Sequence, residues 1–388
     1  MPLQKWTLID PARNTRLDHL DITPVEVGGE PGSFSVQART LRSGLSDGVL
    51  SVRLETGSCV VEILPTRGMG IWKAWYRGEE IGWKSPVRGP VHPSFVPLME
   101  PSGLGWLDGF DELLVRCGLE SNGAPEFDAE GRLKYPLHGR IANRPAHFAE
   151  ISLDVEKGQL ALHGEVEETR FHFHKLRLRT SIVMTIGQSR VHVHDEIVNL
   201  SGSPAAAQML YHINFGHPLL DAGSRLVAPI RQVVPRNAHS ALGIATWDSF
   251  AAEEPGFAEQ VYFLQLAGDA SDQTQVLLKN AHGTRGVGLH FNNRQLPWFT
   301  LWKNTTSLAD GFVTGLEPGT NFPNPRTFEG QHGRVVSLAP GASATFDLHF
   351  QPLGSTAQVE AAEQAVRQLQ GSTSPTIHKQ PLPDWCAP

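Results

Sequence analysis

The sequence predicts an all-β protein, a sandwich of two large antiparallel sheets with one short helix near the C-terminus. Three observations lead to this prediction. Short runs of alternating apolar and polar residues recur along the chain with turn residues between them, which is typical of antiparallel strands. The 38 glycines and 28 prolines suit a fold with many turns. Helical periodicity is convincing only in the last part of the chain.

The predicted strands are short, and each can turn one face to a core because successive side chains point to opposite faces. No internal repeat and no interdomain linker interrupts the series, so a single domain over residues 1–354 is the most economical organisation. The clearest runs are Leu50–Leu54, Cys59–Leu64, Leu160–Gly164, Lys175–Thr180, Val191–His194, Val261–Leu264, Trp298–Trp302 and Thr345–Phe350.

Residues 355–388 are expected to form a helix followed by an extended tail. Ser355 and Gln358 can form a capping box at the start of the helix, and Gly371 ends it. The tail from Ser372 is rich in proline and serine, and Trp385 would anchor it to the surface. The apolar face of the helix would consist of Val359, Ala362, Val366 and Leu369.

Composition and charge indicate which kinds of binding partner and which cellular compartment to expect. The formal net charge is -7 and no stripe of lysine and arginine occurs, which argues against a nucleic-acid partner. No apolar stretch is long enough to cross a bilayer, and the first residues lack the apolar segment of a signal peptide. The scattered cysteines, Cys59, Cys117 and Cys386, are expected to be free thiols in a reducing compartment. We therefore expect a cytoplasmic monomer or homodimer that acts on a small molecule.

Two segments supply candidate groups for proton transfer. Glu317 stands between the strand pattern of residues 298–302 and a loop rich in proline, glycine and asparagine. His212 and Asn214 stand at the end of another strand pattern, in the run Leu210–Pro218. A carboxylate and an imidazole are a minimal set for moving protons on a bound substrate. The alternative for Glu317 is a solvated loop acid.

The segment from Pro86 to Pro136 breaks the strand rhythm and is expected to be a functional insertion. Proteins hold sugars with tryptophan faces together with carboxylates and arginine. The alternative is a surface loop whose tryptophan fills a gap. Candidate substrate-binding residues in this segment are Trp106, Asp108, Asp111, Glu112 and Arg116.

A third cluster lies in residues 137–145, where His138, Arg140, Asn143 and Arg144 supply several hydrogen-bond donors. Arg144 would equally suit a surface ion pair.

Together these segments resemble those of aldose 1-epimerases, or galactose mutarotases. Residues 314–324 resemble the family's Leu-Glu-x-x-x-x-Pro segment, which continues with Asp or Asn, but have one extra residue before the proline. Residues 211–215 are similar to its Asn-His-x-Tyr-Phe run, and residues 139–144 match its Gly-Arg-x-x-Asn-Arg run. The segments occur in the family's order, and the likeness extends from about residue 50 to residue 350.

The resemblance implies a β-supersandwich and a mechanism without metal or other cofactor, acting on a carbohydrate. Glu317 would take the proton of the anomeric hydroxyl, and His212 would protonate the ring oxygen, so that the ring opens and recloses on the other face. His138 would fill the role of the family's second catalytic histidine. Arg140 and Asn143 would hold ring hydroxyls. We expect His212 and Glu317 to face each other across a cavity of the size of a sugar ring.

The sequence also departs from the family. His138 runs directly into the Gly-Arg segment, and the insertion and the turn at residues 65–70 indicate a divergent branch. The substrate of such a branch would be a modified, acidic or keto sugar, and its reaction could differ from mutarotation. Arg67, Arg116, Arg231 and Lys303 would suit an anionic group, although surface or ion-pair roles fit each equally well.

Histidine pairs raise the question of a metal. His172 with His174, and His192 with His194, have the spacing that places two side chains on one face of a strand. A site made from His138, His212, His217 and Glu317 is a separate alternative. Strand histidines are common without metal, and we expect no metal at either place.

Two other functions remain open at this point. In a lyase or hydrolase, Glu317 would pair with Asp108, Asp111 or Glu112 across a glycosidic bond. In a sugar-binding protein without activity, the pocket would be present but proton transfer would not occur.

Overall fold

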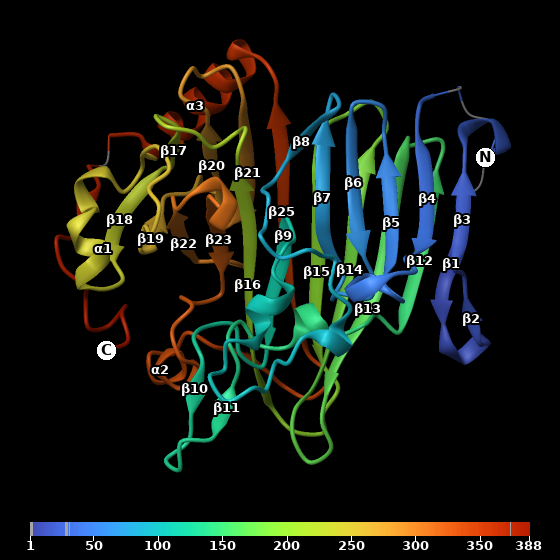
Figure 1. The fold of residues 1–388 in the computed structure, drawn as a ribbon, viewed down its shortest axis with the longest axis horizontal. Coiled ribbons are helices and arrows are strands. Elements are labelled where there is room, and N and C mark those ends of the chain that lie inside the picture. Colours follow the sequence, from blue (N-terminus) through green and yellow to red (C-terminus); the bar gives the residue numbers. More distant parts are fainter. Residues whose placement is uncertain (1–2, 28–29, 31, 373) are drawn as a thin grey trace.

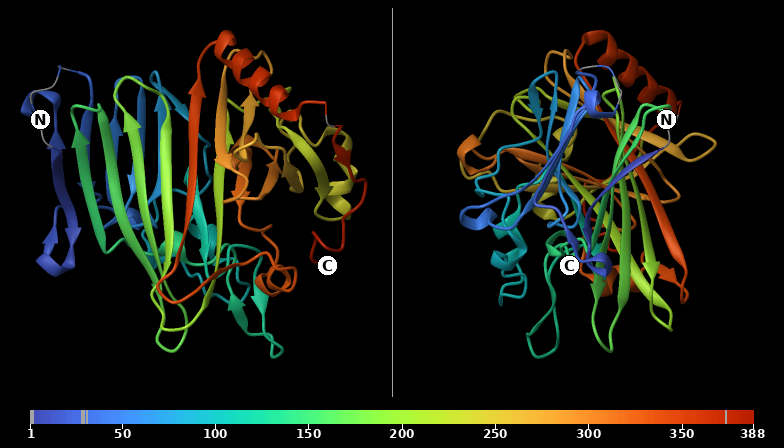
Figure 2. Two further views of the ribbon diagram at one scale, coloured as in Figure 1. Left: turned by 180° about the vertical axis from the view of Figure 1, so that it is seen from behind. Right: turned by 90° about the vertical axis from the view of Figure 1, so that its right-hand side faces the viewer.

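The structure, a computed structural model, describes residues 3–27, 30, 32–372 and 374–388. Most described strands belong to two large sheets, which lie face to face as two layers (Figures 1 and 2). The predicted all-β sandwich is therefore confirmed. None of the described helices is both long enough and apolar enough to span a membrane.

The first sheet has ten described strands in the order β17-β20-β21-β25-β15-β14-β13-β12-β1-β2. Its strands alternate as the sequence predicts, because in β14 the side chains of Leu176, Leu178 and Ile182 are buried between more exposed neighbours. The bounds are β1 Gln4–Asp10, β2 Thr15–Arg16, β12 Phe148–Asp154, β13 Gln159–Thr169, β14 Lys175–Thr185, β15 Val191–Asn199, β17 Arg225–Val227, β20 Gln273–Lys279, β21 Gly286–Asn292 and β25 Ser343–Leu353.

The second sheet has fourteen described strands, with β23, β16 and β9 next to one another near its middle. Apolar side chains from both sheets form one large core between them. The bounds are β3 His19–Ile22, β4 Ser35–Thr40, β5 Leu50–Glu55, β6 Cys59–Leu64, β7 Gly70–Tyr76, β8 Glu79–Ile81, β9 Leu114–Leu119, β16 Ala205–Gly216, β18 Ile230–Pro235, β19 Gln260–Leu266, β22 Trp298–Asn304, β23 Val313–Gly319, β24 Val336–Leu338 and β26 Thr376–Ile377.

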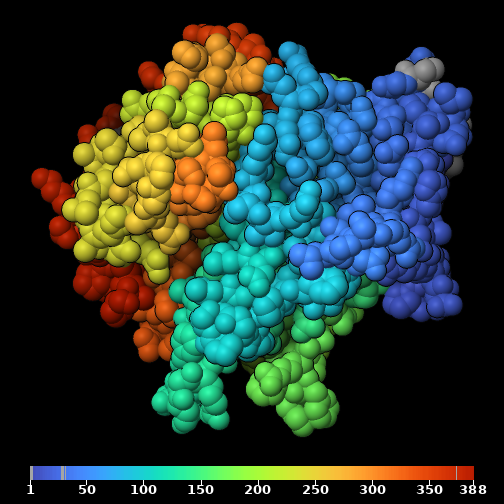
Figure 3. Space-filling view, viewed as in Figure 1, coloured from blue at the N-terminus to red at the C-terminus, as the bar shows by residue number. Residues whose placement is uncertain are grey.

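The predicted insertion covers the outer face of the second sheet. It is not irregular throughout, since it contains the central strand β9 and the two-stranded ribbon of β10 (Glu126–Phe127) and β11 (Leu133–Tyr135). Its cyan residues lie over the centre of the face seen in Figure 3. A second apolar cluster, which includes Trp83, Trp106 and Phe110, packs there against β9 and β16. The strands beneath this cover are buried on both faces.

Short helices and the tail complete the fold. The helices are α1 (Ala238–Leu242), α2 (Arg326–Gln331) and α3 (Thr356–Gln370). Ser355 caps α3 by accepting a hydrogen bond from the Gln358 amide, as predicted, and Gly371 follows with φ 57°. Buried Val359 and Val366 of α3 pack against Leu277 of β20. The tail returns to the second sheet, where β26 pairs with β18 and Trp385 packs on Phe322.

Candidate active site

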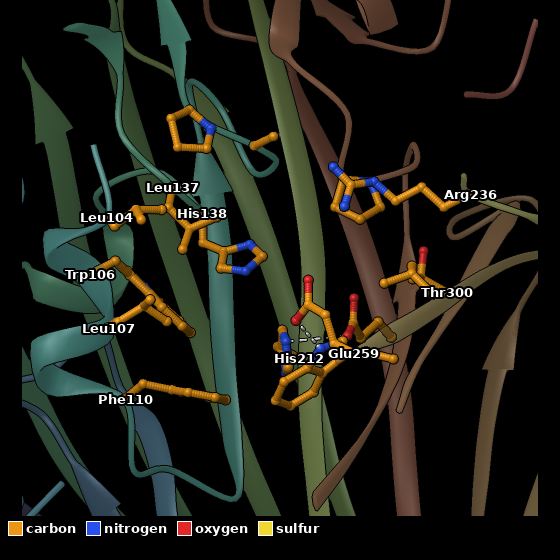
Figure 4. Close-up of a pocket in the computed structure, with 16 residues that line it drawn as sticks. Leu104, Trp106, Leu107, Phe110, Leu137, His138, His212, Arg236, Glu259 and Thr300 are labelled. Atoms are coloured by element: carbon orange, nitrogen blue, oxygen red, sulfur yellow. Dashed lines mark hydrogen bonds and ion pairs between the residues drawn. The ribbon is translucent and has the colours of Figure 1, made fainter. Parts of the chain in front are cut away.

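A cavity of about 390 Å³ opens between the insertion and the outer face of the second sheet. One wall is aromatic, formed by Trp106 and Phe110 of the insertion and by Trp302 of β22. Figure 4 shows the polar side chains that reach into the cavity from several elements. The polar or charged lining residues are His138, His212, Arg236, Glu259, Thr300 and Glu317.

His212 and Glu317 lie side by side on adjacent strands. The register that pairs Leu210 with Gly319 and Ile213 with Leu316 sets His212 of β16 opposite Glu317 of β23. The His212 Nε2 atom is 3.2 Å from Glu317 Oε1, and the two side chains are 5% and 2% exposed.

This geometry corrects two expectations from the sequence. Both residues lie inside strands rather than at strand ends. They are also in contact with each other, so a sugar ring cannot lie between them as expected. Gly315 leaves the room for this contact, because a Cβ there would lie 2.5 Å from Glu317 Oε1 and 3.0 Å from His212 Cε1.

Asn214 fixes the tautomer of His212. The Asn214 amide nitrogen donates to the backbone oxygens of Glu112 (3.0 Å) and His212 (3.3 Å), so its side-chain oxygen must face His212 Nδ1, at 2.6 Å. His212 Nδ1 therefore carries the hydrogen, and Nε2 presents a lone pair to Glu317. In agreement, Glu317 Oε1 accepts no hydrogen bond from any described group.

Burial shifts the pKa values of the two groups in opposite directions, in each case against the charged form. Desolvation, and secondarily the charge of Glu259, raises the pKa of Glu317 well above its ordinary value. Desolvation, followed by the proximity of His138, lowers the pKa of His212 well below its ordinary value. Both shifts favour a resting pair in which a protonated Glu317 donates to a neutral His212. One proton is shared between two neighbouring groups.

His138 lies next to this pair. Its ring centroid is 5.4 Å from that of His212 and 4.6 Å from that of Trp106. His138 Nδ1 is 3.0 Å from the backbone oxygen of Asn122, which can only accept, so Nδ1 carries the hydrogen and Nε2 has a free lone pair. Burial lowers the pKa of His138 to about 4, so its imidazole is neutral.

Two buried polar atoms of the cavity lack a hydrogen-bond partner within the part of the chain that the structure describes. They are Trp106 Nε1 and Thr300 Oγ1. Because buried polar groups are nearly always paired in folded proteins, such groups indicate a bound ligand or water. Donors and acceptors beside aromatic faces fit a molecule with several hydroxyl groups.

Other residues predicted to bind substrate act as scaffold instead. Arg67 pairs with Glu112 at 2.6 Å and donates to Asn143 Oδ1, with all three side chains buried. Arg116 pairs with Asp195 at 2.5 Å, deep between the sheets. None of these five side chains lines the cavity.

The remaining predicted residues also lie outside the cavity lining. Lys303 Nζ donates to the backbone oxygens of Thr246 (3.0 Å) and Ser249 (2.6 Å). Asp111 accepts a hydrogen bond from the Trp72 indole at 2.7 Å. Arg140 Nη2 is 3.6 Å from the Met99 sulfur. The exposed side chains are Asp108, Arg231 and His217. Asn214, as described, positions His212.

The histidine pairs do not form a metal site in the described part of the chain. His172 lies in the loop between β13 and β14, with φ 67°, rather than on a strand. His174 lies close enough to Glu120 and Glu168 for the three to share an ion. Burial lowers the pKa of His174, but hydrogen bonds with both carboxylates outweigh it and raise the pKa to about 9, so a protonated imidazole and an ion pair explain the group.

His192 and His194 do share one face of β15, as their spacing predicts. Both contact Asp347, at 3.3 Å and 2.8 Å. Neither histidine lines the cavity that contains His212 and Glu317.

The lining residues that were not site candidates from the sequence include Phe110, Arg236, Glu259 and Thr300. Phe110 lies in the same run as Trp106, and Thr300 lies in a predicted strand. The sequence therefore gave some indication that these two residues lie near the site. Arg236 and Glu259 flank β18 and β19 and belong to no motif. Only the pairing of β18 with β19, and of β19 with β22, brings them to this cavity.

Comparison with known families and structures extends this picture. Residues 46–351 match the family model described as "Domain of unknown function (DUF4432)". Comparison with curated proteins gave no match. The chain is 34% identical to a Klebsiella pneumoniae protein of known crystal structure that is named, provisionally, as an aldose 1-epimerase. That likeness has a TM-score of 0.95 and covers 98% of this chain and 99% of that chain.

Two more distant structures share the fold. A galactose mutarotase-like protein from Clostridium acetobutylicum is 14% identical with a TM-score of 0.56, over 83% of this chain and 99% of that chain. A galactose 1-epimerase from Lactobacillus acidophilus is 13% identical with a TM-score of 0.54, over 83% of this chain and 100% of that chain. The resemblance deduced from the sequence is thereby confirmed: the chain belongs to the DUF4432 family and has the galactose mutarotase-like fold.

Proposed function

We propose that this protein is a carbohydrate isomerase that interconverts the anomers of a free sugar or sugar derivative by acid–base opening of the ring. The single observation that carries the proposal is the contact between His212 and Glu317, whose Nε2 and Oε1 atoms lie 3.2 Å apart on the floor of an aromatic cavity. The name of the Klebsiella pneumoniae relative, aldose 1-epimerase, agrees with it.

The pair matches the two oxygens that must exchange protons. In a cyclic sugar the anomeric hydroxyl oxygen and the ring oxygen are bonded to the same carbon, so they lie side by side. In such a pair the protonated Glu317 can donate to the ring oxygen while His212 Nε2 accepts the hydroxyl proton, which reverses the roles expected from the family resemblance. On reclosure the roles reverse, because the proton then sits on the other member of the pair. The side-by-side placement of His212 and Glu317 therefore suits this reaction.

The surroundings of the pair support binding of a polyhydroxylated ring. His138 Nε2 can accept a hydrogen bond from a hydroxyl, whereas the unpaired Trp106 Nε1 can donate one. The faces of Trp106, Phe110 and Trp302 can cover the apolar side of the ring. His138 lies beside His212, and we propose that its Nε2 can take the hydroxyl proton in place of His212.

Cleavage of a glycosidic bond has weaker support. The carboxylates of Asp108, Asp111 and Glu112 lie outside the cavity, so none of them can act with Glu317 across a bond. Glu259 is the other carboxylate among the described lining residues, and it accepts a hydrogen bond from Trp302 Nε1 at 2.6 Å.

The test is exchange between α and β anomers, measured by NMR over a panel of neutral and acidic monosaccharides. We expect the protein to accelerate exchange of at least one sugar. The Glu317→Gln variant should lose about 10²- to 10⁴-fold of that acceleration, because it removes one acid–base group. Glu196→Gln, which changes a carboxylate outside the cavity, is the matched control and should retain full activity. Binding of sugars without any acceleration, or a fully active Glu317→Gln variant, would contradict the proposal.

A further inference from the structure

Arg236 offers the cavity a guanidinium group that no described residue neutralises. The residue directly follows β18, and its backbone amide donates to the Val261 oxygen at 2.9 Å, which fixes where the side chain starts. The side chain lines the cavity and is half-buried. Figure 4 shows it reaching over the cavity on the side across from His138. Among the described residues, no hydrogen bond or ion pair engages its guanidinium.

The other titratable groups of the cavity leave this charge uncompensated. Burial raises the pKa of Glu317 and lowers the pKa of both His138 and His212, which favours the uncharged form of all three groups. Glu259 is exposed at the rim, is engaged by Trp302, and makes no ion pair with Arg236 within 4.0 Å. An arginine that has no ion pair with a described residue, at a cavity whose acidic lining residues are Glu259 and Glu317, is suited to bind an anion.

We propose that Arg236 binds a carboxylate of the substrate, so that the sugars taken by this cavity are sugar acids. The proposal rests on the proposed function, since it names the substrate class of the same site. A sugar whose anomeric carbon lies over His212 and Glu317 would extend its far end towards Arg236. The planar guanidinium can donate to both oxygens of a carboxylate at once.

A carboxylate fits this cavity better than a phosphate. The described lining residues include one cation and no lysine. A phosphate carries close to two negative charges and is usually held by additional cations or by several backbone amides. Glu259 at the rim would also repel a second negative charge more strongly than the first. The single positive charge of Arg236 therefore matches the single negative charge of a carboxylate.

The test measures binding without turnover. Calorimetric titrations in the Glu317→Gln background would compare a hexose, the corresponding hexuronic acid and the corresponding hexose 6-phosphate. We expect the hexuronic acid to bind about 10-fold tighter than the hexose, as a charge-assisted hydrogen-bonded pair implies. Adding Arg236→Gln should remove that preference. Adding Arg231→Gln, which removes an exposed arginine from β18 outside the cavity, should leave it intact.

Each outcome decides the inference. Equal or tighter binding of the neutral hexose, or a preference for the hexuronic acid that survives Arg236→Gln, overturns it. Tightest binding of the hexose 6-phosphate overturns the assignment to a carboxylate. If anomer exchange is accelerated only for neutral sugars, the proposed function holds and the inference fails. If the hexuronic acid binds through Arg236 but no sugar is exchanged, the inference holds and the proposed function fails.

Discussion

The charge state of the pair of His212 and Glu317 can be tested through stability alone. The perturbation is Glu317→Gln, which keeps the size of the side chain and replaces a carboxyl group with an amide that can still donate to His212 Nε2. If the resting pair is neutral, the change removes no charge from the native protein. If the pair were an imidazolium and a carboxylate, the same change would leave a buried charge without its partner.

The two cases predict opposite signs. Glu317 ionises near its ordinary value of 4.5 in the unfolded chain but only at higher pH in the folded protein. The native state therefore binds more protons than the unfolded state above pH 4.5, and wild-type stability falls as pH rises from there towards the folded pKa. Glutamine lacks this loss, so the variant should gain up to about 1.4 kcal/mol per pH unit relative to wild type within that window. An ion pair predicts instead that the variant loses about 3–5 kcal/mol near neutral pH.

The assay is urea unfolding of wild type and variant at pH values from 5 to 8, with the free energy of unfolding extrapolated to zero denaturant. A difference that favours the variant and grows with pH supports a neutral pair. The Glu196→Gln control should show no such trend, because Glu196 is half-exposed and bonded to Arg179. A variant less stable than wild type at pH 7, by several kcal/mol, would refute the argument that one proton is shared between two otherwise neutral groups.

Two further predictions concern the groups that hold the site in place. Arg116→Met should destabilise the protein by about 3–5 kcal/mol in urea unfolding, because it leaves Asp195 buried without its cation. The double variant Arg116→Met with Asp195→Asn should recover part of that loss, and strictly additive losses would contradict the pairing. Asn214→Leu should lower anomer exchange by about 10²-fold and change its pH profile, because His212 Nδ1 then loses its acceptor. An unchanged pH profile would show that Asn214 does not set the tautomer.

The sequence predicted the architecture well because the information is local. Alternation in strands such as β14, the capping box at Ser355 and the glycine after α3 each lie within a few residues. Motif order also predicted that His212 and Glu317 meet, and the structure brings them together with His138 in one cavity. Their relation within the cavity could not be predicted, because it depends on the register between β16 and β23.

The arginines show why the rest of the site was harder to predict. Arg67 and Arg116 stand in the turn and the insertion where the sequence departs from the family, and a cation there suits an anionic ligand as well as it suits a protein carboxylate. The choice depends on which carboxylates the fold places nearby. Glu112 and Asp195 are that close, at 2.6 Å and 2.5 Å, and bury the two guanidinium groups. Arg236 has no described carboxylate within ion-pair distance, and the sequence around it does not predict this difference from Arg67 and Arg116.

The insertion connects these observations. By covering the outer face of β9, β16 and β23, it buries strands that in most antiparallel sheets would have one face in water. An acid placed on such a strand becomes harder to ionise, and an imidazole becomes harder to protonate. Because His212 and Glu317 lie opposite each other, both shifts favour the state in which the proton between them rests on Glu317. The insertion that shapes the cavity therefore also determines which member of the pair is the acid and which is the base when a substrate binds.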